Sequence, residues 1–276
     1  MKKPCNWVTE ELDEATMHLS EALRLGRDEL LALIGAGGKT TTLFRLASEL
    51  REAGGKILVT TTTKIFKPTR PHVDRLFLAE DLEALLSQMA HIRAPVIIGA
   101  GSGIGDDNKL LGLPSEWLDQ LHGRGAFDAV LVEADGAASR FFKVPSEIEP
   151  VVPKSCSVVI WTMAIKVLGK PWDASFVHRV ERAIALLEVK PHTPITKEHI
   201  VRLVMHPLGC LKGVPPHCRK IALINQADTS EEIAQAQELG ELLAPLGFER
   251  VVITSYLSDP PVKEILSPPH PRKELK

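Results

Sequence analysis

The stretch LLALIGAGGKTTTLFRLA, residues 30–47, joins an apolar run, a glycine-rich turn and a helical pattern. A buried strand that leads through glycines into a helix beginning with Lys39 and Thr40 is typical of a phosphate-binding loop. In such a loop the main-chain amides and the positive end of the helix dipole point at an anion. Glycines allow the anion to approach because they carry no side chain. The stretch therefore predicts a nucleotide-binding α/β protein.

The predicted ligand of this loop is a nucleoside triphosphate, ATP or GTP. We expect Lys39 to reach the β and γ phosphates and to take part in catalysis, and the Thr40 hydroxyl to bind Mg²⁺. The predicted nucleotide-binding residues of the loop are Gly35, Ala36, Gly37, Gly38, Lys39, Thr40 and Thr41.

The loop departs from the usual pattern GxxxxGK[ST], because GAGGK at residues 35–39 is two residues shorter. Short loops of the form GxxGKT resemble those of amide ligases of the Mur family, so a shortened loop can still hold a triphosphate. The alternative is a glycine turn that only connects a strand to a helix. A plain turn explains neither the lysine nor the threonine.

Two acidic residues end a second apolar strand, DAVLVEADGA at residues 128–137. Glu133 and Asp135 lie at its carboxyl end, which in a parallel sheet adjoins the phosphate-binding loop. Residues two apart on a strand share a face, so both carboxylates could bind Mg²⁺, or one could position an attacking water or hydroxyl. The alternative is an ordinary buried strand that ends in an Asp-Gly turn.

Four threonines, Thr60–Thr63, stand at the end of the second strand pattern along the chain, in ILVTTTTK. Their hydroxyls could complete the shell of Mg²⁺, and Thr62 is a predicted metal ligand. Because threonine is also a good strand former, the run has a purely structural explanation.

The element LINQAD, residues 223–228, resembles the NKxD element with which GTPases recognise guanine. Asn225 and Asp228 are therefore predicted nucleotide-binding residues. Gln226 stands in the lysine position, which leaves ATP and GTP both open. Alternatively, Asp228 or Thr229 begins the next helix, since Thr229 and Glu232 fit a capping box.

Seven strand patterns recur along the chain, and most are continuous apolar runs rich in Val and Ile, as in parallel sheets buried on both faces. They span residues 30–35, 56–61, 94–100, 128–134, 156–162, 220–225 and 249–255. Helical patterns lie at residues 9–25, 40–53, 80–91, 173–189 and 229–244. The alternation predicts an α/β fold, a three-layer, doubly wound and mostly parallel sheet of the P-loop NTPase type.

The predicted organisation is a helical extension at residues 1–28 and one α/β domain at residues 29–276. Residues 163–218 interrupt the alternation with two helical patterns and the proline-rich GVPPHC. They predict a helical insertion on one edge of the domain.

The overall composition favours an ordinary globular protein. Apolar residues make up 44% of the 276 residues and the formal net charge is −2. This charge provides no general attraction to nucleic acid or to anionic membranes. No apolar run approaches the roughly 18 residues of a membrane span. We expect a cytoplasmic protein without a nucleic-acid or membrane partner.

Seven pieces of the sequence together resemble the selenium-dependent molybdenum hydroxylase accessory proteins of YqeC type. They are LIGAGGKTTTLFRLA, ILVTTTTK, LVEADGA, FKVPSEIEPVVP, LGKPW with the following VHR, HPLGCLKGVP and LINQAD. The resemblance implies a P-loop nucleotide-binding protein that helps to mature a selenium-containing molybdenum hydroxylase. Its implied partners are that hydroxylase or its other maturation factors.

The expected function is that of a Mg²⁺-dependent nucleoside triphosphatase whose hydrolysis drives or gates cofactor insertion. Lys39, Glu133 and Asp135 are its predicted catalytic residues, and Thr40, Thr62, Glu133 and Asp135 its predicted metal ligands. Two alternatives stay open: a small-molecule kinase or ATP-dependent ligase with the same short loop, and a nucleotide sensor with negligible turnover.

Overall fold

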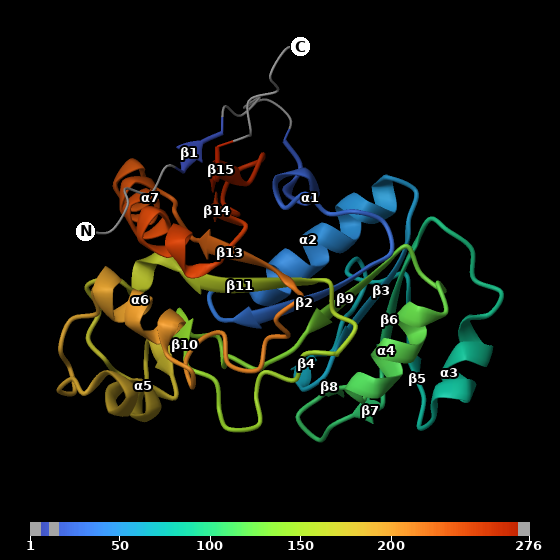
Figure 1. Cartoon of the computed structure of the whole chain (residues 1–276). Coiled ribbons are helices and arrows are strands. Elements are labelled where there is room, and N and C mark those ends of the chain that lie inside the picture. Colours follow the sequence, from blue (N-terminus) through green and yellow to red (C-terminus); the bar gives the residue numbers. More distant parts are fainter. Residues whose placement is uncertain (1–6, 11–16, 270–276) are drawn as a thin grey trace, which may run out of the picture.

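A computed structural model describes residues 7–10 and 17–269. Ten strands form one large sheet in the order β1-β15-β14-β13-β11-β2-β9-β3-β6-β5, and β15 pairs antiparallel with both of its neighbours, β1 and β14 (Figure 1). The large sheet contains β1 (Val8–Thr9), β2 (Glu29–Gly35), β3 (Lys56–Thr61), β5 (Arg75–Leu78), β6 (Val96–Gly101), β9 (Ala129–Glu133), β11 (Val158–Ala164), β13 (Arg219–Asn225), β14 (Arg250–Thr254) and β15 (Val262–Ser267). The prediction of a mostly parallel α/β fold is confirmed.

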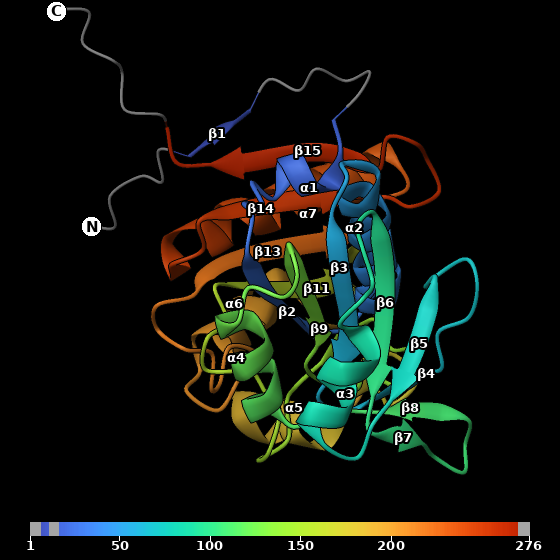
Figure 2. The same ribbon diagram turned by 90° about the vertical axis from the view of Figure 1, so that its right-hand side faces the viewer.

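Two smaller sheets accompany the large one. One pairs β10 (Phe142–Lys143) with β12 (Val177–His178), and the other contains β4 (Lys64–Phe66), β7 (Gly103–Ile104) and β8 (Lys109–Leu111). The second lies near the β5 and β6 end of the large sheet in both views (Figure 2).

Seven α-helices and two short 3-10 helices connect the described strands. They are α1 (Leu19–Ala22), α2 (Lys39–Glu52), α3 (Leu82–Met89), α4 (Ser115–Gly123), α5 (Val180–Leu187), α6 (Lys197–Met205), α7 (Ser230–Leu243), η1 (Ile165–Val167) and η2 (Ala244–Leu246).

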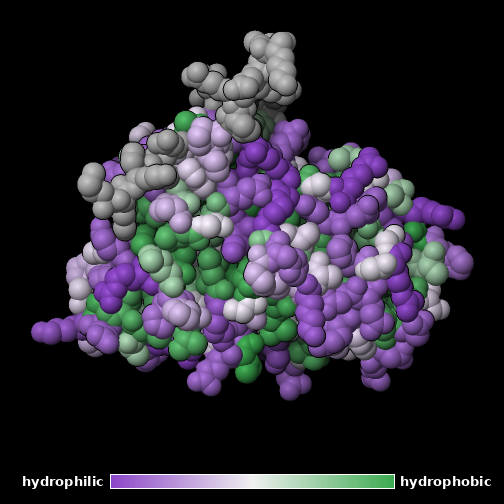
Figure 3. Space-filling model, in the orientation of Figure 1, coloured by the Kyte–Doolittle hydropathy of each residue, from purple (hydrophilic) through white to green (hydrophobic). Residues whose placement is uncertain are grey.

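The side chains of β2 alternate between two apolar cores, which is why its whole run is hydrophobic. Leu31 and Leu33 pack in the core under α1 and α2. Leu30, Ala32 and Ile34 face the other core, which receives buried residues from α3 to α7. Helices thus cover both faces, as a three-layer fold requires. The face in Figure 3 is mixed, with hydrophobic residues showing mainly in its left and lower central parts.

Two helix predictions differ from the structure. The pattern at 173–189 predicted one helix, but residues 177–178 form β12 and only Val180–Leu187 is helical. Arg179 adopts a left-handed conformation (φ 61°) directly before α5, and this turn separates the two elements. Of the pattern at 9–25, Leu19–Ala22 is helical, while Val8–Thr9 pairs with β15 as a strand. Residues 11–16 lie outside the described residues.

Residues 163–218 lead from β11 to the neighbouring strand β13, in the middle of the sheet and not at an outer strand. They contain η1, β12, α5 and α6, and α6 contacts α7. β12 pairs with β10, which brings the start of α5 towards the segment that follows β9. This connection therefore contributes side chains to the same side of the sheet as Asp135, as described below.

The parallel register places the carboxyl ends of the central strands together. Leu33 of β2 pairs with Glu133 of β9, which also pairs with Thr61 of β3. On the other side of β2, Gly35 pairs with Thr162 of β11. The loops that follow these strands meet at one edge, where ligands of open α/β sheets bind.

No helix within residues 7–10 and 17–269 is long and apolar enough to cross a membrane.

Candidate functional site

The loop between β2 and α2 has a backbone that only glycine adopts readily. Gly38 precedes α2 with φ 133°, and a Cβ atom placed there would lie 2.2 Å from Nδ2 of Asn225. At Gly37 (φ 76°) a Cβ would lie 2.3 Å from the main-chain nitrogen of Ala164. Both positions therefore require glycine for conformation and for space.

Hydrogen bonds fix the first half of this loop to three neighbouring segments. The amide of Gly35 donates to Oδ2 of Asp135 at 3.0 Å. The amide of Ala36 donates to the carbonyl of Thr162 at 2.9 Å, and that of Gly37 to the carbonyl of Arg140 at 3.0 Å. These three predicted binding residues shape the loop, and their amides are already used within the protein.

The second half of the loop offers free donors. No side chain caps α2, and the described residues supply no main-chain acceptor for the amides of residues 38–41. Uncapped amides at a helix N-terminus, together with the helix dipole, favour an anion. The amide donors that remain available to an anion thus belong to Gly38, Lys39, Thr40 and Thr41.

Lys39 lies at the start of α2, and its side chain is only 3% exposed. Its Nζ lies 3.1 Å from Oδ1 of Asp135 and 3.7 Å from Oε1 of Glu133, and it donates to the carbonyl of Gly35 at 2.7 Å. Burial alone lowers the pKa of Lys39, but the two carboxylates outweigh burial and hold the pKa above its usual value. The lysine is therefore a buried ammonium ion beside the free amides.

The structure brings both predicted acids to this lysine. Oε2 of Glu133 accepts a 2.8 Å hydrogen bond from the hydroxyl of Thr40. Burial raises the pKa of Glu133, although Lys39 and Thr40 oppose the shift. Oδ1 of Asp135 is buried and receives no well-directed hydrogen bond among the described residues, despite its closeness to Lys39. This oxygen retains capacity for a further partner.

Three further charged residues extend the site, and they are not among the predicted site residues. Lys143 of β10 is fully buried, 3.1 Å from Oδ2 of Asp135 and 2.8 Å from Oε2 of Glu149. Arg179 lies 2.7 Å from the same oxygen of Glu149. Burial lowers the pKa of Lys143, whereas Lys143 and Arg179 outweigh burial at Glu149 and lower its pKa. In the sequence, Lys143 stands between apolar residues in FKVP, and this position was the available indication that its side chain is buried.

Three of the four threonines, Thr60 and Thr61 at the end of β3 and Thr62 directly after it, direct their hydroxyls to main-chain carbonyl groups. Thr60 donates to Ala100 at 2.8 Å, and Thr61 donates to the carbonyl of Glu133 at 2.7 Å. Thr62, the predicted metal ligand, donates to the carbonyl of Val151 at 2.8 Å. Its hydroxyl therefore does not point at the carboxylates of Glu133 and Asp135.

Asn225, at the end of β13, contacts the glycine loop directly. Its Nδ2 donates to the carbonyl of Gly37 at 2.9 Å, and its Oδ1 accepts from Thr254 at 3.0 Å. Asp228 makes different contacts: its carboxylate pairs with Lys166 and accepts from the hydroxyl of Ser255. The structure thus joins Asn225 to the loop, whereas Asp228 is held by residues outside it.

The side chains around Lys39 could supply part of the ligand set of a Mg²⁺ ion. Within residues 7–10 and 17–269, no three His, Cys, Asp or Glu side chains form a metal site. Mg²⁺ commonly binds one or two carboxylates and takes its other ligands from water and substrate phosphates. Glu133, Asp135 and the Thr40 hydroxyl match such a partial ligand set.

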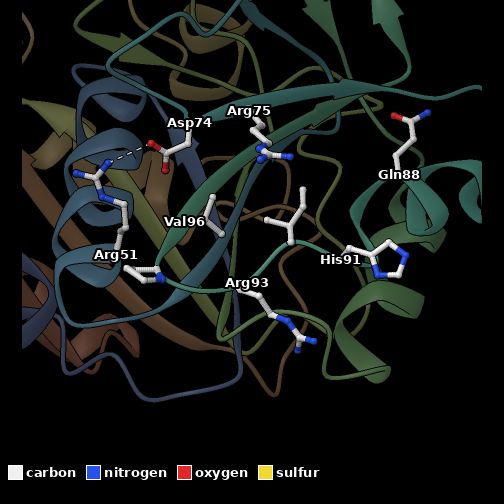
Figure 4. Close-up of a pocket in the computed structure, with 9 residues that line it drawn as sticks. Arg51, Asp74, Arg75, Gln88, His91, Arg93 and Val96 are labelled. Atoms are coloured by element: carbon white, nitrogen blue, oxygen red, sulfur yellow. Dashed lines mark hydrogen bonds and ion pairs between the residues drawn. The ribbon is translucent and has the colours of Figure 1, made fainter.

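A separate pocket of about 570 Å³ lies at the opposite edge of the sheet, beside Val96 at the amino end of β6 (Figure 4). Arg51, Arg75 and Arg93 line it, and Arg51 lies 3.4 Å from Asp74. None of the predicted site residues lines this pocket.

The fold and this site define a three-layer α/β protein of P-loop NTPase-like architecture, with a glycine loop, a buried lysine and two acids at the carboxyl edge of its sheet. Residues 31–181 match the family model described as YqeC protein. The chain is also 36% identical, over 221 residues, to a protein of Escherichia coli (strain K12) named Uncharacterized protein YqeC; the match covers 80% of this chain and 83% of that protein. The chain belongs to the YqeC family.

Proposed function

We propose that this protein binds a magnesium nucleoside triphosphate at the glycine loop and hydrolyses it. One observation carries the proposal: a buried ammonium group, Lys39, lies between two acids at a helix N-terminus whose first amides have no partner among the described residues. A cation, directed amides and carboxylates are the groups that phosphoryl transfer requires.

The residues present can divide the work as follows. The amides of residues 38–41 bind the phosphate oxygens, and Lys39 turns from Asp135 to the phosphates and stabilises their charge. The Thr40 hydroxyl and Glu133 hold the metal, which neutralises negative charge on the phosphates when it is bound. Asp135, released from Lys39 and still held by Lys143, orients the attacking water.

The biological role that we propose is maturation of a selenium-dependent molybdenum hydroxylase. The proposal is supported by membership of the YqeC family, together with the resemblance carried by the seven sequence pieces. The partners would be the hydroxylase or its other maturation factors, and nucleotide hydrolysis would time their association or release.

Equilibrium titration of ATP and GTP with Mg²⁺ tests the binding site. Loss of the hydrogen-bonded charge in Lys39→Ala should weaken affinity by about 1.5–3 kcal/mol, or roughly 10- to 150-fold. Lys154→Ala is the matched control, because Lys154 is exposed and lies outside the site. Thermal unfolding of both variants verifies that they are folded. Unchanged affinity in folded Lys39→Ala would refute the placement of the phosphates.

Measurement of phosphate release tests the proposed role in hydroxylase maturation. The maturation proposal predicts slow release by the protein alone and faster release with the hydroxylase. Transfer of phosphate to a small-molecule acceptor would instead indicate the kinase alternative, and tight binding without turnover would indicate a nucleotide sensor.

A further inference from the structure

A second pocket adjoins the first turn of α2. It has a volume of about 530 Å³, and Thr40 and Thr41 form part of its wall. We call it the aromatic pocket, because its other lining residues include Phe44, Phe66, His72 and Tyr256. Its volume lies within the usual range of about 300–1,000 Å³ for small-molecule sites.

The aromatic rings of this pocket come from three separate segments. Phe44 of α2 stacks on His72 with ring centroids 4.4 Å apart and an angle of 19° between the planes. Tyr256 follows β14, and its hydroxyl lies 2.7 Å from that of Thr42. Phe66 ends β4 and is 68% exposed, which is unusual for so large an apolar side chain.

The pocket and the phosphate-binding loop share residues. Thr40 and Thr41 supply two of the free amides at the start of α2, and both residues also line the pocket. A ligand whose phosphates occupy the amides can therefore extend directly into the pocket. The group that it places there would lie among the aromatic side chains that line the pocket.

Asp228, the residue predicted to recognise a base, is already engaged. One carboxylate oxygen pairs with Lys166 and the other accepts from Ser255. To bind a base, this carboxylate would have to give up one of these two partners. Phe66 has a weaker contact, with Nζ of Lys109 5.7 Å from the ring centroid, and its side chain stays largely exposed.

We infer that the nucleoside part of the triphosphate lies in the aromatic pocket, with its base against Phe66 and Tyr256. This inference rests on the proposed function, which supplies the triphosphate. Stacking on an aromatic face tolerates every base because all bases present a π surface. The protein therefore accepts ATP and GTP with affinities that differ by less than about fivefold.

The test compares nucleotides with a ligand that has phosphates but no base. Affinities for ATP, GTP and inorganic tripolyphosphate are measured with Mg²⁺ by calorimetry on the full chain. Phe66→Ala should weaken both nucleotides by about tenfold, the usual effect of losing one stacking ring, and leave tripolyphosphate within about twofold. Phe66→Trp, which restores a ring, should bind nucleotides like the wild type.

Two outcomes would overturn the inference, and they are distinguishable. If Phe66→Ala and Tyr256→Ala retain nucleotide affinity while Asp228→Asn loses it, the base lies at Asp228 and the proposed function stands. If the wild type binds neither nucleotides nor tripolyphosphate, the proposed function fails and the inference fails with it.

Discussion

Lys39 and Asp135 form a buried ion pair with 3.1 Å between Nζ and Oδ1, and each side chain is only 3% exposed. Removing charges from water is costly, so such a pair contributes little net stability by itself. It does hold the two side chains close together at the carboxyl edge of the sheet. The pair therefore suits a site that exchanges one anion for another.

The steric requirement at Gly38 gives the first prediction. Gly38→Ala would bring a Cβ to within 2.2 Å of Asn225 at φ 133°, so we expect a loss of about 3 kcal/mol in the free energy of unfolding. Gly54→Ala is the matched control: Gly54 also has a positive φ (93°), but nothing lies within 4 Å of its Cβ position. Gly54→Ala should lower the free energy of unfolding by only about 1–2 kcal/mol. Chemical denaturation measures both, and equal losses would contradict the crowding at Gly38.

Because Asn225 donates to the carbonyl of Gly37, we expect it to affect triphosphate binding through the glycine loop. Asn225→Ala removes its bonds to Gly37 and Thr254 and leaves buried partners unsatisfied, so stability should fall by about 2–4 kcal/mol. Triphosphate affinity should fall as well. Thr254→Val removes the bond between Thr254 and Asn225 but leaves the bond between Asn225 and Gly37. It should therefore lower the free energy of unfolding by about 1 kcal/mol and preserve triphosphate affinity. Calorimetric titration of both folded variants separates the two effects, and a parallel loss of affinity would argue against this role for Asn225.

Thr40 links the helix start to Glu133. Thr40→Val keeps the shape but removes the 2.8 Å hydrogen bond, so stability should fall by about 1–2 kcal/mol and the benefit of Mg²⁺ for triphosphate binding should disappear. Thr40→Ser retains the hydroxyl and should retain that benefit. The measurement is triphosphate affinity with and without Mg²⁺. Equal Mg²⁺ dependence in Thr40→Val and the wild type would exclude Thr40 as a metal ligand.

The lowered pKa of Glu149 predicts a pH dependence. Although burial acts in the opposite direction, Lys143 and Arg179 hold this pKa below its usual value of 4.5. The unfolded state thus takes up the proton at a higher pH than the folded state does. The contribution of Glu149 is therefore present above about pH 4.5 and is lost as the pH falls through the lower, folded pKa.

Glu149→Gln checks this dependence. At pH 7 the variant should be less stable than the wild type by about 1.5–3 kcal/mol, because Lys143 and Arg179 lose a charged partner. The difference should shrink as the pH is lowered below 4.5. Urea unfolding from pH 3 to pH 7 provides the comparison, and a constant difference across that range would disprove the assignment.

The seven central strands of the large sheet, from β14 to β6, were predictable because burial on both faces leaves an uninterrupted apolar run. β1, β15 and β5, at the two ends of the sheet, were not among the predicted strands. The pattern at 56–61 matches β3 (Lys56–Thr61), and that at 249–255 contains β14 (Arg250–Thr254). The prediction of one helix at 173–189 was wrong because the helical spacing of its apolar residues does not reveal the turn and the short strand that precede α5. Asp173 accepts a hydrogen bond from the amide of Ser175, and a strand pair with β10 follows.

The candidate site was partly predictable for a similar reason. Parallel strands bring their carboxyl ends together, so Lys39, Glu133 and Asp135 were expected to meet. Lys143 and Tyr256 were not expected, since they come from short segments whose position depends on distant contacts. The Thr62 hydroxyl likewise donates to the distant carbonyl of Val151, and no local sequence pattern predicts that hydrogen bond.

The hydrogen bonds that hold Gly35, Ala36 and Gly37 have a consequence for affinity. The loop loses its conformational entropy during folding, so a ligand that binds there would meet a preorganised site and association would carry less of that free-energy cost. The same bonds make folding and recognition inseparable at this point of the chain. A substitution that loosens the loop will harm both together.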